Sequence, residues 1–310
     1  MQRLSALVFL LLAASIWLGP AAAQTTFDSR RPPIIDMHLH AYPLDDGAPP
    51  AVNPVTGLPS VAGTSAELRD STLAALERYN IVKAVTSGPP ETVDQWRDAA
   101  PDRIMVGAWV DEASPLPDLA SLRAEMEAGR VDVLGELILQ MRGMAPSDPR
   151  MEPYYALAEE MDIPVGIHTG VGPSGTPYEP CCPNFRVMLG NPALVEEVLI
   201  RHPRLRIYLM HGGWPYLQET KAILSMYPQV YADLATINWI IPREEFHAYL
   251  RELIVAGFGK RLLFGSDQMV WPEAIGMAVE GIESATFLTE EEKRDIFYNN
   301  AVRFLRLDKE

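Results

Sequence analysis

The sequence predicts a (β/α)8 barrel, and three observations support this fold. Strand-like and helix-like segments alternate eight times after a lead-in rich in Pro and Arg at residues 30–33. Several strand-like runs are apolar on both faces, which is typical of a parallel sheet covered by helices on both sides. The chain has 310 residues, and α/β barrels commonly fill such a length with one domain. An open doubly wound sheet is the alternative, but it needs fewer strands.

The expected strands are short runs rich in Ile, Val and Leu. They cover residues 34–38, 82–87, 104–110, 133–139, 164–168, 207–211, 230–234 and 262–265. Helical periodicity occurs over residues 66–79 (capped by Thr64 or Ser65), 154–161, 193–201, 216–226, 244–256 and 290–307. Two connections, 41–63 and 170–191, are unusually long and rich in Gly and Pro. Because each follows a strand that ends in histidine, we expect both to cover an active site.

The first 23 residues are expected to form a signal peptide rather than part of the fold. Arg3 precedes the apolar segment 4–18, which is too short to span a bilayer comfortably, and Ala21-Ala22-Ala23 matches a cleavage site. We therefore expect export, to a bacterial periplasm, and a single mature domain over residues 24–310. An uncleaved amino-terminal anchor is the alternative.

The charge of the chain excludes one class of partner. The formal net charge is −15, and removal of Arg3 with the signal peptide makes it −16. An acidic chain argues against a nucleic-acid-binding surface, because phosphate contacts need Lys and Arg. We expect a small-molecule substrate, no nucleic acid and no membrane contact after signal cleavage. Assembly into a homo-oligomer remains open.

The two cysteines are adjacent, Cys181 and Cys182. Neighbouring Cα atoms lie about 3.8 Å apart, below the usual range of about 4.4–6.8 Å for a disulfide. We therefore expect free or buried thiols, although an exported protein could keep a disulfide between them.

The motif His38-Leu-His40 ends the first expected strand. Side chains alternate faces along a strand, so the two imidazoles point the same way with roughly 7 Å between them. Two imidazoles held in this way can bind one cation. A His-x-His pair alone is weak evidence, and the positions of the other histidines strengthen it.

Three further polar residues end expected strands: His168 before Thr-Gly, His211 before Gly-Gly, and Asp267 after Phe-Gly-Ser. The carboxyl ends of all barrel strands meet at one face, where the catalytic groups of such enzymes lie. Imidazole and carboxylate groups gathered there are suited to a divalent metal. The remaining histidines, His202 and His247, have polar neighbours and are expected at the surface.

Glu136 is a carboxylate inside the apolar run 133–139. An unpaired ionised carboxylate is costly to bury, so Glu136 must be paired, protonated or bound to metal. Its position near the end of the fourth strand fits a second metal site or a proton-transfer group. A structural Glu neutralised by Arg or His inside the barrel is the equal alternative.

Four tryptophans lie at or just after expected strand ends, which favours a pocket for an apolar or aromatic body; plain cover for the rim is the alternative. Arg142, like Gln140, follows the fourth strand and could contact a carbonyl or carboxylate. The expected substrate-pocket residues are therefore Trp109, Arg142, Trp214, Trp239 and Trp271.

At this point the chain resembles the amidohydrolase superfamily, in particular the group that includes aminocarboxymuconate-semialdehyde decarboxylase. The resemblance covers nearly the whole mature chain. It rests on Asp36-x-His38-x-His40, His168-Thr-Gly, His211-Gly-Gly, Phe264-Gly-Ser-Asp267 and Asn299-Asn300-Ala301-x-Arg303-Phe.

The resemblance implies a role for each motif residue. A divalent metal, usually zinc, would be bound by four residues, and Asp36 would be structural. His211 would polarise the substrate or act as a base. Gly135-Glu136 resembles instead the strand-four carboxylate of branches with two metals, so that one or two ions remain possible. The four expected ligands are His38, His40, His168 and Asp267.

The function we expect is metal-dependent hydrolysis of a small-molecule amide, ester or lactone. A metal-activated water would attack a polarised carbonyl, Asp267 would take a proton, and His211 would stabilise the oxyanion. Non-oxidative decarboxylation of an aromatic or unsaturated carboxylic acid is one alternative. A periplasmic ligand-binding protein without catalytic activity is another, which the complete ligand set disfavours. The sequence does not identify the substrate.

Overall fold

The computed structural model describes residues 31–45, 47–111 and 114–309, and it confirms the (β/α)8 barrel. The signal peptide and its cleavage site lie outside the described residues, so they stay predictions. Eight strands form one parallel sheet in sequence order. They are β1 (Ile34–His40), β2 (Ile81–Ser87), β3 (Ile104–Val110), β4 (Val133–Leu137), β5 (Val165–His168), β6 (Ile207–Met210), β7 (Val230–Asp233) and β8 (Leu262–Leu263).

Two backbone hydrogen bonds connect β1 to the segment that follows β8. Met37 N donates to Phe264 O at 2.9 Å, and Asp267 N donates to His38 O at 2.7 Å. The second of these joins two residues that the sequence marks as metal ligands. The strand ends at which the barrel closes therefore belong to the candidate site itself.

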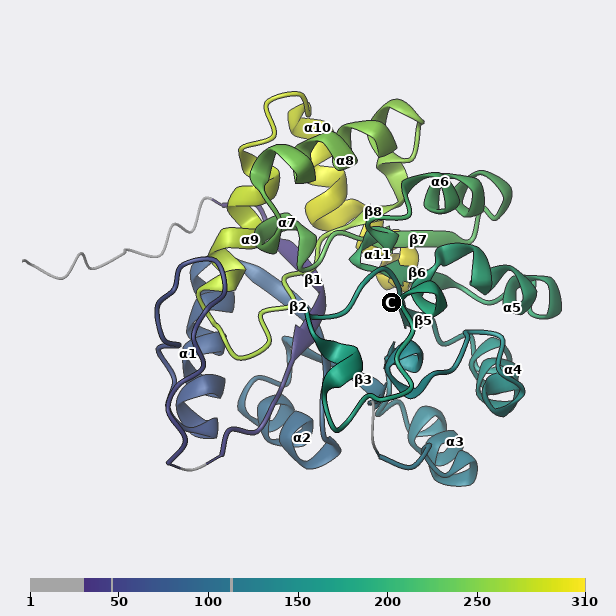
Figure 1. Ribbon diagram of the computed structural model, residues 1–310, viewed down its shortest axis with the longest axis horizontal. Coiled ribbons are helices and arrows are strands. Elements are labelled where there is room, and N and C mark those ends of the chain that lie inside the picture. The colour runs from purple at the N-terminus through teal and green to yellow at the C-terminus, as the bar shows by residue number, and fades with distance from the viewer. Residues whose placement is uncertain (1–30, 46, 112–113, 310) are drawn as a thin grey trace, which may run out of the picture.

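The helices lie around the outside of the strands, as Figure 1 shows. They are α1 (Ser65–Arg78), α2 (Pro90–Ala99), α3 (Leu119–Glu127), α4 (Glu152–Glu160), α5 (Glu196–Arg201), α6 (Leu217–Met226), α7 (Ile237–Ile240), α8 (Arg243–Val255), α9 (Ala274–Glu283), α10 (Glu290–Arg294) and α11 (Asn300–Leu305). Among the described residues, no helix is both long enough and apolar enough to cross a membrane.

Two apolar cores hold these layers together. The larger one lies between the strands and the surrounding helices and includes Leu68, Trp96 and Phe246, each almost fully buried. The smaller one joins inward-facing strand residues such as Ile35 and Met37 to Phe304 of α11. The carboxyl-terminal helix thus packs against the interior side chains of the barrel, and Figure 1 places it behind the strands.

Four helices, α2, α3, α7 and α9, were not among the segments we expected from helical periodicity. The expected helix over 290–307 is interrupted by a π-helical turn, Asp295–Asn299. The expected helix over 193–201 begins as a 3-10 turn, Pro192–Val195, with proline in its first turn, where its missing amide hydrogen costs nothing. These differences change element boundaries and leave the strand order unchanged.

Two expectations about side chains were wrong. Cys181 and Cys182 form a disulfide; their short Cα separation disfavours a bridge statistically but does not forbid it. His202 is buried rather than at the surface, because Glu152 and Glu159 of α4 approach its two ring nitrogens at 3.0 and 3.6 Å. His247 is half-buried, with Nε2 3.0 Å from the carbonyl of Gly281.

Candidate metal centre

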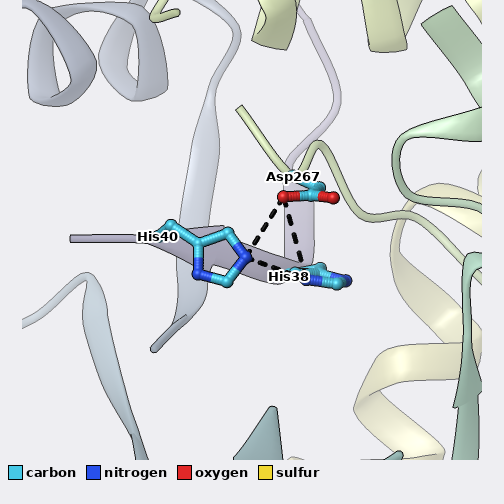
Figure 2. A group of neighbouring side chains, drawn as sticks. All are labelled: His38, His40 and Asp267. Atoms are coloured by element: carbon cyan, nitrogen blue, oxygen red, sulfur yellow. Dashed lines mark hydrogen bonds and ion pairs between the residues drawn. The ribbon is translucent and has the colours of Figure 1, made fainter. Parts of the chain in front are cut away.

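The histidine pair of β1 points into the carboxyl-terminal mouth of the barrel, as strand alternation predicts. His38 and His40 are buried, and their Nε2 atoms lie 3.2 Å apart. Asp267, four residues after β8, places Oδ1 3.1 Å from His40 Nε2 and 3.9 Å from His38 Nε2. Figure 2 shows the three side chains directed toward one another, with the histidines on one strand and the carboxylate on the facing segment.

Glu136 lies at the centre of the site, and its two carboxylate oxygens face different partners. Oε2 is 3.4 Å from His38 Nε2 and 3.3 Å from His40 Nε2. Oε1 is 2.6 Å from His168 Nδ1 and 3.4 Å from His211 Nε2. His168 Nδ1 and His211 Nε2 are themselves 3.1 Å apart.

These distances define two donor sets that share Glu136. The first set comprises the Nε2 atoms of His38 and His40, Asp267 Oδ1 and Glu136 Oε2. The second set comprises His168 Nδ1, His211 Nε2 and Glu136 Oε1. The sequence grouped His168 with His38, His40 and Asp267; in the structure its Nδ1 lies 2.6 Å from Glu136 Oε1 and 3.1 Å from His211 Nε2, and its ligand role stays a prediction.

The spacings of the first set fit a divalent cation, whereas His168 Nδ1 and Glu136 Oε1 of the second set are at hydrogen-bonding distance, 2.6 Å. Ligand atoms about 2.1 Å from a tetrahedral zinc ion lie about 3.4 Å from one another, and the first set has spacings of 3.1–3.9 Å. Groups of three donors close enough for one ion include His38, His40 and Asp267, and also His38, Glu136 and His211. Asp267 Oδ1 is buried and lacks a hydrogen-bond partner. A bound cation would supply the missing partner and balance the negative charge of this oxygen.

The electrostatics of the cluster also favour a cation. Burial disfavours the charged form of His38, but the carboxylates of Asp267 and Glu136 outweigh it and raise the pKa of His38 well above its usual value. The same balance raises the pKa of His40 to about 9. Burial likewise opposes ionisation of Glu136, yet the charge of His38 holds the pKa of Glu136 well below its usual value. A divalent cation can replace the protons that now balance these carboxylates.

Several supporting contacts were not anticipated from the sequence. Ser87 at the end of β2 donates to the carbonyl of Gly135 at 2.8 Å and accepts from the amide of Glu136 at 3.0 Å. Asp233 Oδ2 lies 3.1 Å from His38 Nδ1, and Thr236 Oγ1 donates to Asp267 Oδ2. These residues are common at strand ends and in turns, so nothing in the sequence distinguishes them.

Asp36 lies below the ligands in β1, where the resemblance suggested a structural role. Its carboxylate accepts from the amides of His38 and Ser266 and from the hydroxyl of Ser266, at 2.6–3.0 Å. Burial raises the pKa of Asp36 to about 6 in spite of these hydrogen bonds. The contacts link β1 to the segment that carries Asp267.

Four of the five expected pocket residues donate hydrogen bonds to other parts of the protein. The indole nitrogens of three tryptophans donate to protein acceptors at 2.8–3.1 Å: Trp214 to Glu245, Trp239 to Ser266 O and Trp271 to Ala51 O. Arg142 Nη1 donates to the carbonyls of Asp111 and Ser114 at 2.9 and 2.7 Å.

Trp109 differs from the other three, because its buried Nε1 has no hydrogen-bond partner. Its ring is 5.8 Å from that of Tyr42, which stacks on His40 at 4.5 Å with an interplanar angle of 10°. Trp109 also packs against an apolar cluster of Ile138, Met141, Cys182 and Phe185. Tyr42 and Trp109 thus form an aromatic wall that adjoins His40, a residue of the first donor set.

Comparison with known proteins assigns the chain to a family. Residues 35–307 match the family described as Amidohydrolase. The chain belongs to the amidohydrolase family. This confirms the resemblance read from the motifs. Members of the family typically use a divalent metal, and this amidohydrolase has candidate His, Asp and Glu ligands for one.

Solved structures similar to this amidohydrolase share its fold at low sequence identity. An uncharacterised TIM-barrel protein from Bordetella bronchiseptica is 20% identical, with a TM-score of 0.66 over 89% of this chain and 99% of that one. A probable 2-pyrone-4,6-dicarboxylic acid hydrolase from Acinetobacter baumannii is 15% identical, with a TM-score of 0.60 over 88% and 99%. A 2,6-dihydroxybenzoate decarboxylase from Rhizobium is 17% identical, with a TM-score of 0.53 over 88% and 99%.

A curated relative is Protein fluG from Emericella nidulans. It is 24% identical to this amidohydrolase over 162 residues, which make up 47% of this chain and 18% of that protein. The chain thus spans less than a fifth of the length of that relative. The fold is shared with solved structures whose names give different reaction classes, a hydrolase and a decarboxylase.

Proposed function

We propose that the protein is a hydrolase of a small-molecule amide, ester or lactone and that it uses two divalent cations. The observation that carries this proposal is the position of Glu136, whose two oxygens face separate donor sets. A carboxylate shared in this way is suited to bridging two ions, and paired ions are used by many hydrolases. Zinc is the proposed metal, because imidazole nitrogen and carboxylate oxygen are typical zinc ligands.

The cations, when bound, would lower the pKa of a water molecule and polarise the substrate carbonyl. Asp267 is placed to take the proton from the attacking water. Its Oδ2 is held by Thr236, which leaves Oδ1 directed into the site. We propose His211 as a ligand through Nε2 rather than as a group that faces the substrate, because Nε2 lies 3.4 Å from Glu136 Oε1 and 3.1 Å from His168 Nδ1.

The wall formed by Tyr42 and Trp109 is proposed to hold an apolar or aromatic part of the substrate. Aromatic rings bury large apolar areas and prefer tilted or stacked contacts with other rings. The wall adjoins His40, so a bound ring would lie beside the reacting carbonyl.

Decarboxylation is the alternative that the comparisons favour, since the similar structures include the 2,6-dihydroxybenzoate decarboxylase. Hydrolysis accounts better for Glu136, because a single cation that clamps a carboxylate does not need a second donor set. Arg142, the expected contact for a substrate carbonyl or carboxylate, uses Nη1 for two loop carbonyls.

The test is metal analysis followed by a screen of lactones, esters, amides and aromatic acids. We expect close to two zinc or manganese ions per chain and incorporation of solvent ¹⁸O into a product carboxylate. Release of CO2 with solvent deuterium at the vacated carbon would replace hydrolysis with decarboxylation. One ion per chain in the fully active protein would overturn the two-metal centre.

Export to a periplasm, a small-molecule partner and a possible homo-oligomer remain part of the proposal. Export follows from the expected signal peptide, and a small-molecule substrate rather than nucleic acid agrees with the acidic composition. Mass spectrometry of the mature amino terminus would test cleavage after Ala23.

A further inference from the structure

The end of β7 contributes no atom to either donor set, yet it contacts residues of both. Asp233, the last residue of β7, makes two of these contacts, and Thr236 in the following turn makes the third. Each contact reaches a residue from a different strand, namely His38 of β1, His211 after β6 and Asp267 after β8.

Asp233 is fully buried and uses both carboxylate oxygens. Oδ2 lies 3.1 Å from His38 Nδ1, and Oδ1 accepts from the amides of His211 and Ala235 at 2.8 and 3.0 Å. A carboxylate on Nδ1 keeps the hydrogen on that nitrogen, so the Nε2 lone pair of His38 is directed at the first donor set. Asp233 therefore orients one ligand through its ring and another through its backbone.

Thr236 fixes the carboxylate of Asp267 by donating to Oδ2. Its own backbone has a positive φ of 59° with ψ of −57°, outside the commonly allowed regions. A β-branched residue rarely adopts this conformation, which is energetically costly. His211 and Asp267, the two ligands beside it, also have positive φ angles of 59° and 47°.

We propose that Asp233 and Thr236 are positioning residues that set the cation affinity of the centre, and that the strained backbone at Thr236 is retained for this role. The inference rests on the proposed function in requiring a bound cation, but it does not depend on the substrate. A glycine at position 236 would suit the backbone better and would lose the hydroxyl. Stability and cation affinity should therefore change in opposite directions in that variant.

The experiment compares Thr236→Gly, Thr236→Ser and the wild-type protein. Zinc affinity is measured by competition with a chromophoric chelator, and the melting temperature is measured on metal-free protein. We expect Thr236→Gly to melt a few degrees higher without metal and to bind zinc about 10–100-fold more weakly, the range for lost supporting contacts. Thr236→Ser keeps the hydroxyl and should restore most of the affinity.

Arg306→Gly is the matched control, because Arg306 has φ of 61° and lies after α11, away from the donor sets. It replaces another residue of positive φ by glycine, with loss of an ion pair to Asp162, and should leave zinc affinity unchanged. Unchanged affinity in Thr236→Gly, or equal loss of affinity in Arg306→Gly, would overturn the role of Thr236.

Asp233→Asn tests the second residue without depending on the folding of the glycine variant. An amide keeps one oxygen for the two backbone donors but presents NH2 to His38 Nδ1. We expect weaker binding, by about 10–100-fold, of the first-set zinc ion and little change at the second set. Unaltered affinity at both sets would contradict the proposal, whereas a wild-type protein that binds no cation would contradict the proposed function as well.

Discussion

Glu136 is the residue on which the proposed centre depends most, because each of its oxygens serves a different donor set. Glu136→Gln replaces one oxygen by an NH2 group, which cannot bind a cation. We expect the metal content to fall from about two ions per chain to one or fewer, and kcat/KM to fall by at least about 10²-fold. Atomic emission analysis of dialysed protein measures the first change.

The exposed Glu291→Gln variant is the control for the loss of one charge. Equal metal content in Glu136→Gln and wild type would assign Glu136 to barrel structure or to proton transfer.

His211 distinguishes the prediction made from sequence from the arrangement in the structure. The sequence predicted a group that acts on the substrate, whereas His211 Nε2 lies 3.4 Å from Glu136 and 3.1 Å from His168. We therefore expect His211→Asn to lose about one metal ion in step with its activity. A variant that keeps both ions while kcat falls by about 10²–10⁴-fold would restore the catalytic role.

The pH dependence of stability should reveal the imidazoles of the first set in metal-free protein. The pKa of His40 is raised to about 9, from an ordinary value of 6.5, by Asp267 and Glu136 acting against burial. A raised folded-state pKa stabilises the fold fully below pH 6.5, and this stabilisation is lost as the pH rises through 9. Urea unfolding of metal-free protein should show this loss, and His40→Gln should abolish much of it.

The sequence could identify candidate ligands but not how they are grouped. His38, His40, His168 and Asp267 stand out because they end strands, and barrel geometry brings such ends together. Their division around Glu136 depends on side-chain direction, which spacing along the chain does not determine. Thr236 could not be recognised at all, because its role depends on an unusual backbone conformation.

Among the elements, α10 has the clearest local basis in sequence. Thr289 Oγ1 accepts from the amide of Glu292 at 3.2 Å, and the carboxylate of Glu292 accepts from the amide of Thr289 at 2.8 Å. This capping box starts the segment that leads to α11 at the base of the barrel. Thr289→Ala should cost about 1 kcal/mol and lower the melting temperature by about 2–4 °C.

Thr289→Ser retains the acceptor and should restore most of that stability. An equal loss in Thr289→Ser would show that packing of the methyl group, rather than the cap, is responsible.

Element boundaries were less predictable than element order. The periodicity of residues 290–307 suggested one helix, but a π-helical turn separates α10 from α11. Phe297 in this turn packs into the larger core, whereas Phe304 in α11 packs into the barrel interior. The apolar side chains of this segment therefore pack into two different cores. The sequence pattern alone does not show at which residue the packing changes from one core to the other.

For the whole molecule, metal removal is the most general test. Cations that bind only the folded state stabilise it by mass action, by about 4 kcal/mol when free metal exceeds Kd about 1,000-fold. Chelation should abolish activity and lower the melting temperature, and added zinc should reverse both effects. A melting temperature that does not respond to chelator or to zinc would contradict a preformed centre.

The hydrogen bond between Asp267 and His38 has a consequence for when the protein can acquire metal. These two ligands lie near opposite ends of the chain, and they meet only where the last strand closes onto the first. A chain synthesised only as far as β7 therefore lacks the Asp267 carboxylate of the first donor set. Cation capture is thus tied to completed folding, and the ions available in the compartment where the barrel closes determine which metal the protein carries.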